Sequence, residues 1–126
     1  MNTEMEMTLT QSPLLESLFD FRKRFNSSER VKKLINNWNR AIMLESIDSK
    51  NNYSFTIEDS ALSQILPGLV ERDPTIHLQA EESILTRIFS GDYNPASALI
   101  DGALAVFSDE RDKVKLEAIA MIIWGM

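Results

Sequence analysis

The chain has 126 residues and a formal net charge of −6, from 13 basic and 19 acidic side chains. That length suits one folded domain, and its apolar content of 44% is ordinary for a globular protein. The acidic balance argues against nucleic acid as a partner, because nucleic-acid binding is driven by basic surface. The absence of cysteine excludes disulfides, thiolate nucleophiles and cysteine metal sites from this chain.

The N-terminal residues carry acids where a signal peptide needs positive charge, and no apolar run is long enough to span a membrane. A cytoplasmic protein is therefore expected. Residues 1–12 have no hydrophobic periodicity and are predicted to form a disordered tail before a single domain over 13–126.

Two helices are predicted at the start of the domain. The first opens at Pro13. Its apolar stripe falls at i, i+4, i+7 and i+11 and consists of Leu14, Leu18, Phe21 and Phe25, and Leu15 and Phe19 widen it. Ser28 is placed to cap a second helix, whose apolar stripe ends at Trp38. Both helices are interpreted as cover for a core.

A β-hairpin is predicted next, from a strand over 40–47 and a second strand over 53–58. The second strand alternates cleanly, with Tyr53, Phe55 and Ile57 on one face. The stretch 61–66 fits either a strand or a helix by pattern alone.

The C-terminal half predicts strand, helix, helix, strand and helix. Residues 75–80 alternate, and the following helix ends at Gly91, where a left-handed residue is expected. Asn94 and Pro95 have the pattern of an N-cap with proline at the first helical position, and Gly102 ends that short helix before a strand over 103–107. Asp109 is placed to cap the last helix. From Leu116 to Trp124 this helix is apolar except for Glu117, so it is expected to face a core on more than one side, a ligand or a partner.

This order of motifs resembles the sterol carrier protein type 2 family, including the related C-terminal domain of bacterial alkyl sulfatases. The likeness rests on Asp73-Pro-Thr-Ile-His-Leu, Ile88-Phe-Ser-Gly-Asp, Asn94-Pro-Ala-Ser-Ala-Leu-Ile-Asp-Gly and Leu104-Ala-Val-Phe-Ser-Asp. The chain has Ser108-Asp109 where the family has Gly-Asp. The resemblance implies an α/β (α+β) fold with a mixed sheet of about five strands, covered on one face by helices that enclose a hydrophobic tunnel. It also favours a third strand over 61–66.

A lipid, fatty acyl or sterol-like ligand is what the resemblance implies for that tunnel. The residues consistent with lining it are Ile84, Ile88, Phe89, Leu99, Leu104, Val106, Leu116, Ile119, Ala120 and Ile123. Each of these side chains would also be needed in a solid core, and the sequence leaves that alternative open.

No pattern in the sequence supports catalysis, a metal or a cofactor. The chain has one histidine, His77, which alternation places on the less apolar face of its strand, as a surface residue. Glu81 and Glu82 are neighbours on a helix and do not face each other. The acidic residues lack the loop spacing of a calcium site, and no phosphate-binding glycine loop is present. A non-enzymatic protein is expected.

Two functions remain open. One is binding of a lipid or fatty acyl ligand, for transfer or for presentation to a separate enzyme. The other is a protein-interaction or homodimerisation module. Residues 22–40 hold seven bases and one acid, a local charge of +6 that leaves −12 for the rest of the chain. This segment is interpreted as a solvated face or as a contact for an anionic membrane or an acidic partner.

Overall fold

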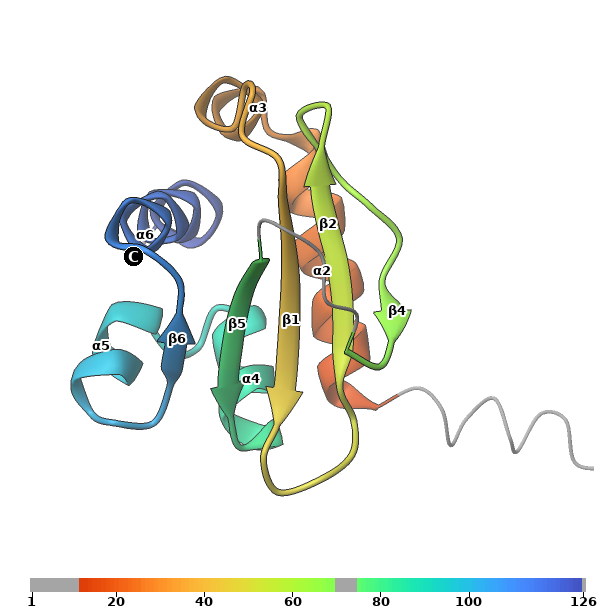
Figure 1. Ribbon diagram of the computed structural model, residues 1–126, viewed down its shortest axis with the longest axis vertical. Helices are drawn as coiled ribbons and strands as arrows, with labels where there is room; N and C mark the ends of the chain where they lie inside the picture. The colour runs from red at the N-terminus through yellow and green to blue at the C-terminus, as the bar shows by residue number, and fades with distance from the viewer. Residues whose placement is uncertain (1–11, 70–74, 126) are drawn as a thin grey trace, which may run out of the picture.

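The computed structural model describes residues 12–69 and 75–125. Within these ranges, helices pack against one mixed β-sheet (Figure 1). The helices are α2 (Pro13–Ser27), α3 (Glu29–Leu34), α4 (Glu82–Phe89), α5 (Pro95–Ile100) and α6 (Glu110–Trp124). The strands are β1 (Arg40–Ser46), β2 (Tyr53–Glu58), β3 (Ala61–Leu62), β4 (Leu66–Pro67), β5 (Thr75–Ala80) and β6 (Ala105–Phe107).

The described strands form a sheet in the order β3-β2-β1-β5-β6, and β4 also pairs with β2. The hairpin of β1 and β2 is antiparallel, with Ile42 opposite Phe55. The central pair, β1 and β5, is parallel, and it aligns Ile42 with Ile76. β6 is antiparallel to β5 and is short. The predicted α+β class with a mixed sheet is confirmed.

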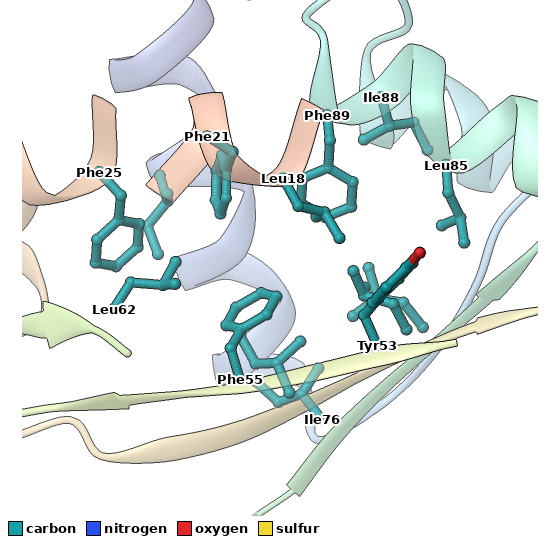
Figure 2. Close-up of a cluster of buried hydrophobic side chains, with 14 of the residues drawn as sticks. Leu18, Phe21, Phe25, Tyr53, Phe55, Leu62, Ile76, Leu85, Ile88 and Phe89 are labelled. Atoms are coloured by element: carbon teal, nitrogen blue, oxygen red, sulfur yellow. The ribbon is translucent and has the colours of Figure 1, made fainter. Parts of the chain in front are cut away.

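The helices lie on one side of the sheet, with α2 and α4 behind it in Figure 1 and with α5 and α6 flanking β6. Alternation along the strands turns Tyr53, Phe55 and Ile57 toward these helices, as predicted, and all three are buried. Figure 2 shows Phe55 and Tyr53 of β2 pointing toward Phe21 and Phe25 of α2 and Phe89 of α4.

Local capping explains where the helices begin. The Ser12 side chain accepts a hydrogen bond from the Leu15 backbone N–H at 3.1 Å, and Ser28 does the same for Val31 at 3.1 Å. Asn94 and Asp109 cap α5 and α6 in the same way. These side chains satisfy amide groups that otherwise have no intrahelical partner.

Gly91 and Gly102 follow the ends of α4 and α5 with φ of +86° and +78°. Both are the left-handed helix ends that the sequence predicts.

Four predictions need correction or fall outside the described residues. The second helix ends at Leu34, so Trp38, the last residue of its predicted stripe, lies beyond the helix in the segment before β1. The third strand over 61–66 is two separate pieces, because Ala61–Leu62 and Leu66–Pro67 each pair with β2 while 63–65 do not continue the ladder. Phe19 is 46% exposed and does not widen the buried stripe of α2. The predicted tail lies outside the described residues, except that Ser12 belongs to the fold as a helix cap.

Candidate apolar binding cavity

A hollow of about 70 Å³ lies between the helix-covered face of the sheet and the helices. Its lining comes from four helices and four strands and is almost wholly apolar. The lining residues are Phe21, Phe25, Ile42, Phe55, Ile57, Leu78, Ile88, Phe89, Pro95, Leu99, Leu104, Val106, Lys113, Leu116, Glu117, Ile119, Ala120 and Trp124.

The inner wall is rigid. Ile42, Phe55, Ile57 and Leu78 stand on the three central strands, whose alternation points them at the helices. The lining residues of α2 and α4 are also buried. The outer side is different, because Leu99 of α5, Val106 of β6 and Leu116 of α6 are only partly buried. The hollow therefore approaches solvent between α5 and α6.

Helix α6 contributes the longest stripe to the hollow. Lys113, Leu116, Glu117, Ala120 and Trp124 fall at i, i+3, i+4, i+7 and i+11, which is one face of a helix. This spacing places two charged side chains, Lys113 and Glu117, on the same stripe as the apolar ones, in the N-terminal half of α6.

Of the ten residues predicted to line a tunnel, eight border the hollow: Ile88, Phe89, Leu99, Leu104, Val106, Leu116, Ile119 and Ala120. Ile84 and Ile123 are not among the lining residues and pack against the core from partly buried positions.

The predicted lining does not include the contributions of α2 and of strands β1, β2 and β5. The sequence pattern indicates only a core-covering role for Phe21 and Phe25. Both are buried, and both also border the hollow. Nothing in a local pattern distinguishes a buried phenylalanine with neighbours on all sides from one with a gap beside it. For Lys113 and Glu117 a signal was available, because their spacing sets them on one face with Ala120 and Trp124.

Trp124 packs in an aromatic cluster at the C-terminal end of α6. Its ring stacks on Phe21, with centroids 5.3 Å apart and planes at 29°, and meets Phe89 edge-on at 6.2 Å. The backbone of Gly91 lies directly beneath it, since a Cβ added at Gly91 would come within 2.9 Å of Trp124 Cδ1. Trp124 therefore fills the space that a larger residue at position 91 would need.

The N-terminal end of α6 is held by a buried polar contact. Asp112 Oδ1 accepts a hydrogen bond from Trp38 Nε1 at 2.9 Å, and its Oδ2 accepts one from Arg40 Nε at 2.8 Å. One turn further, Lys115 Nζ donates to the Leu34 carbonyl at 3.1 Å. Burial favours the neutral acid at Asp112, but the hydrogen bonds from Arg40 and Trp38 and the nearby positive charges outweigh it and lower the pKa of Asp112. The start of α6 is thereby fixed to α3 and β1.

His77 lies on the opposite face of the sheet and is not among the residues that line the hollow. It is 25% exposed, and its Nε2 lies 2.9 Å from Glu45 Oε1, which also accepts a hydrogen bond from Gln79 at 2.8 Å. The hydrogen bond from Gln79, joined by His77, lowers the pKa of Glu45. Among the described residues, no group of three or more His, Asp or Glu side chains is placed to hold a metal ion.

No helix within 12–69 and 75–125 has the length and apolar character needed to cross a membrane.

Neither the known family models nor the curated protein sequences contain a match to this chain. Solved structures do resemble it. Sterol carrier protein domain 2 of Helicoverpa armigera superposes with a TM-score of 0.65 over 90% of this chain and 90% of its own, at 11% identity. The ubiquinone synthesis protein UbiJ-SCP2 superposes with a TM-score of 0.62 over 84% of this chain and 86% of its own, at 16% identity.

The fold is that of the sterol carrier protein 2 domains. A sec-alkyl sulfatase also contains it, with a TM-score of 0.66 over 90% of this chain at 14% identity. The present chain spans 16% of that sulfatase. In the sterol-carrier-like fold described here, the hollow lies between the sheet and the helices that cover it, which is where the resemblance placed a tunnel.

Proposed function

We propose that this protein binds a lipid, fatty acyl or other apolar ligand in the hollow beneath α6, without catalysing a reaction. The observation that carries the proposal is the hollow itself, lined on the inside by a rigid sheet and on the outside by partly exposed apolar side chains. A well-packed interior has few voids of this size, and an apolar hollow stays dry and receptive to an apolar ligand. The likeness to sterol carrier proteins supports the same reading.

The hollow must enlarge to accept a lipid. At about 70 Å³, it is smaller than the roughly 300–1,000 Å³ of pockets that hold drug-sized molecules. The strands cannot move apart without breaking their hydrogen-bonded ladder. The outer wall can move, because α6 is fixed near Asp112 while its last turn rests on side-chain contacts to Phe21 and Phe89. In this proposal the C-terminal half of α6 swings outward as the ligand enters.

Two measurements test the binding. Native mass spectrometry and lipid extraction of the freshly purified protein are expected to find a bound lipid. A titration with an uncharged fluorescent alkyl probe is expected to saturate at one probe per chain.

A matched pair of variants tests where the ligand binds. Ala120→Trp fills the hollow from α6 and is expected to abolish binding. Met121→Trp, at an exposed position of the same helix, is expected to leave binding unchanged. Equal binding by both variants would place the ligand elsewhere.

A second function, self-association or attachment to a separate lipid- or alkyl-processing enzyme, is favoured by a different observation. Val114 and Met121 lie two turns apart on the outer side of α6 and are 62% and 61% exposed, and Ile100 at the end of α5 is 86% exposed. Sedimentation equilibrium of the wild type and of Met121→Lys distinguishes the cases. A wild-type dimer that the substitution dissociates favours the interaction module.

Contact of residues 22–40 with an anionic membrane stays a prediction. Four of the bases already have partners in the fold. Arg24 pairs with Asp20, Lys32 with Glu29 and Arg40 with Asp112, and Arg22 donates to the Leu62 carbonyl. Lys23, Arg30 and Lys33 are exposed. Each base near an anionic surface contributes about 1 kcal/mol. Flotation with anionic and neutral vesicles is expected to show salt-sensitive binding to the anionic ones only, reduced in Lys23→Gln with Lys33→Gln.

A further inference from the structure

Two charged side chains, Lys113 and Glu117, border a hollow whose other described lining residues carry no charge. They stand one turn apart on α6, so they share one edge of the hollow. Glu117 is exposed and Lys113 is partly exposed, which places this edge where the hollow meets solvent. An apolar pocket with a few convergent polar groups uses those groups to fix and select the ligand's polar end.

The charges at this edge do not favour an anion. The Lys113 ammonium lies 3.5 Å from Glu110 Oε1, and Glu117 adds a second carboxylate one helical turn further along α6. The whole chain has a net charge of −6. An incoming carboxylate would be the third negative group beside a single ammonium, and it would lose part of its hydration as its alkyl chain entered the hollow.

A hydroxyl headgroup is chemically complementary to both side chains. It donates one hydrogen bond, which the Glu117 carboxylate accepts, and it accepts one from the ammonium of Lys113. Hydrogen bonds with an ionised partner are stronger than those between neutral groups, and the hydroxyl carries no charge to be repelled. The narrowness of the hollow favours a linear chain, because a flexible chain threads between side chains where a rigid ring system needs one wide opening.

We propose that Lys113 and Glu117 form a headgroup selector, which accepts an uncharged, hydroxyl-headed linear amphiphile such as a long-chain alcohol and rejects carboxylates. This inference rests on the proposed binding function. In this proposal Glu117 repels anions, and Lys113 and Glu117 together recognise the hydroxyl group.

The test compares 1-decanol with decanoate at pH 8, where the carboxylate is fully ionised, by isothermal titration calorimetry. A carboxylate binds any apolar site less well than an alcohol does. The diagnostic quantity is therefore the dissociation constant for decanoate divided by that for 1-decanol, compared between the variants. Glu117→Gln is expected to lower that ratio about tenfold, chiefly by improving decanoate. Lys113→Gln is expected to raise it severalfold. Glu81→Gln, an equal charge change at an exposed position outside the hollow, is the control and is expected to leave the ratio unchanged.

The possible results distinguish a failure of headgroup selection from a failure of ligand binding. If both ligands bind and the ratio is the same in the wild type, Glu117→Gln and Lys113→Gln, headgroup selection is overturned while the binding function stands. If Glu81→Gln shifts the ratio as much as Glu117→Gln does, selection comes from net charge and the assignment to this pair is overturned. If neither ligand binds to the wild type, the proposed function fails, and the inference fails with it.

Discussion

Truncating a side chain at the wall of the hollow should cost less stability than truncating the same side chain in the solid part of the core. Ile119 of α6 borders the hollow and is 2% exposed, whereas Ile76 of β5 is fully buried and does not border it. Both replacements by alanine remove three carbons, and at about 0.8 kcal/mol per buried methylene the transfer cost is about 2.4 kcal/mol in each case.

The difference arises from the space left behind. At Ile76 the removed atoms leave a new hollow among packed neighbours, and at about 24 cal/mol per Å³ this adds about 1–2 kcal/mol. At Ile119 part of the side chain already faces empty space, so fewer contacts are lost, and the enlarged hollow approaches solvent between α5 and α6. We therefore expect a loss of about 3.5–4.5 kcal/mol for Ile76→Ala and about 2–3 kcal/mol for Ile119→Ala.

Urea unfolding of the wild type and both variants, followed by circular dichroism, measures the two free-energy losses with one protocol. A titration of each folded variant with the uncharged alkyl probe supplies a second readout, which should change for Ile119→Ala and not for Ile76→Ala. Equal stability losses together with equal probe affinities would refute the reasoning, because the wall of the hollow would then behave as ordinary core.

Two further predictions concern the ends of α6 and the turn beneath it. Asp112→Asn should cost about 1.5–3 kcal/mol in a urea melt, since it removes a buried charge-assisted hydrogen bond, whereas Asp109→Asn keeps the cap and should cost only a few tenths. Because the pKa of Asp112 is lowered from its ordinary value of 3.8, its contribution is complete above that range and is lost as the pH falls through the folded value, so the gap between wild type and Asp112→Asn should close in acid. Gly91→Ala should lower the melting temperature more than Gly102→Ala does, and it should also shift the tryptophan fluorescence. Both positions have positive φ, but only at Gly91 would the new Cβ come within 2.9 Å of Trp124. Equal falls in melting temperature for the two variants would contradict the contact.

Local patterns were sufficient for most of the elements. The stripe of α2, the alternation of β2 and the glycines after α4 and α5 each depend on residues a few positions apart, and each is found as expected. The prediction of one continuous strand over 61–66 was wrong, because this stretch pairs with β2 at two separate places, Ala61–Leu62 and Leu66–Pro67, and alternation does not indicate the break between them.

The sequence pattern does not predict contacts between residues that are far apart in the chain. Asp112 reads in the sequence as a first-turn acid that complements the helix dipole. In the structure it binds Trp38 and Arg40, which are 74 and 72 residues away. The same limit applies to the hollow, because its shape depends on the distance between α6 and the sheet, which no local period specifies.

The way α6 is attached bears on how a hollow of this small volume accepts the ligand that we propose. Its first two turns are fixed by hydrogen bonds from Trp38 and Arg40 to Asp112 and from Lys115 to a backbone carbonyl, and these are directional contacts with little tolerance for movement. Its last two turns are held by aromatic and aliphatic contacts around Trp124, which lose little energy when a ligand's apolar chain replaces them. In the proposed function, a chain of methylenes that enters beneath α6 exchanges one set of apolar contacts for another, while the polar anchor and the sheet stay intact. The same proposal leaves the headgroup near the anchored end of α6, beside Lys113 and Glu117.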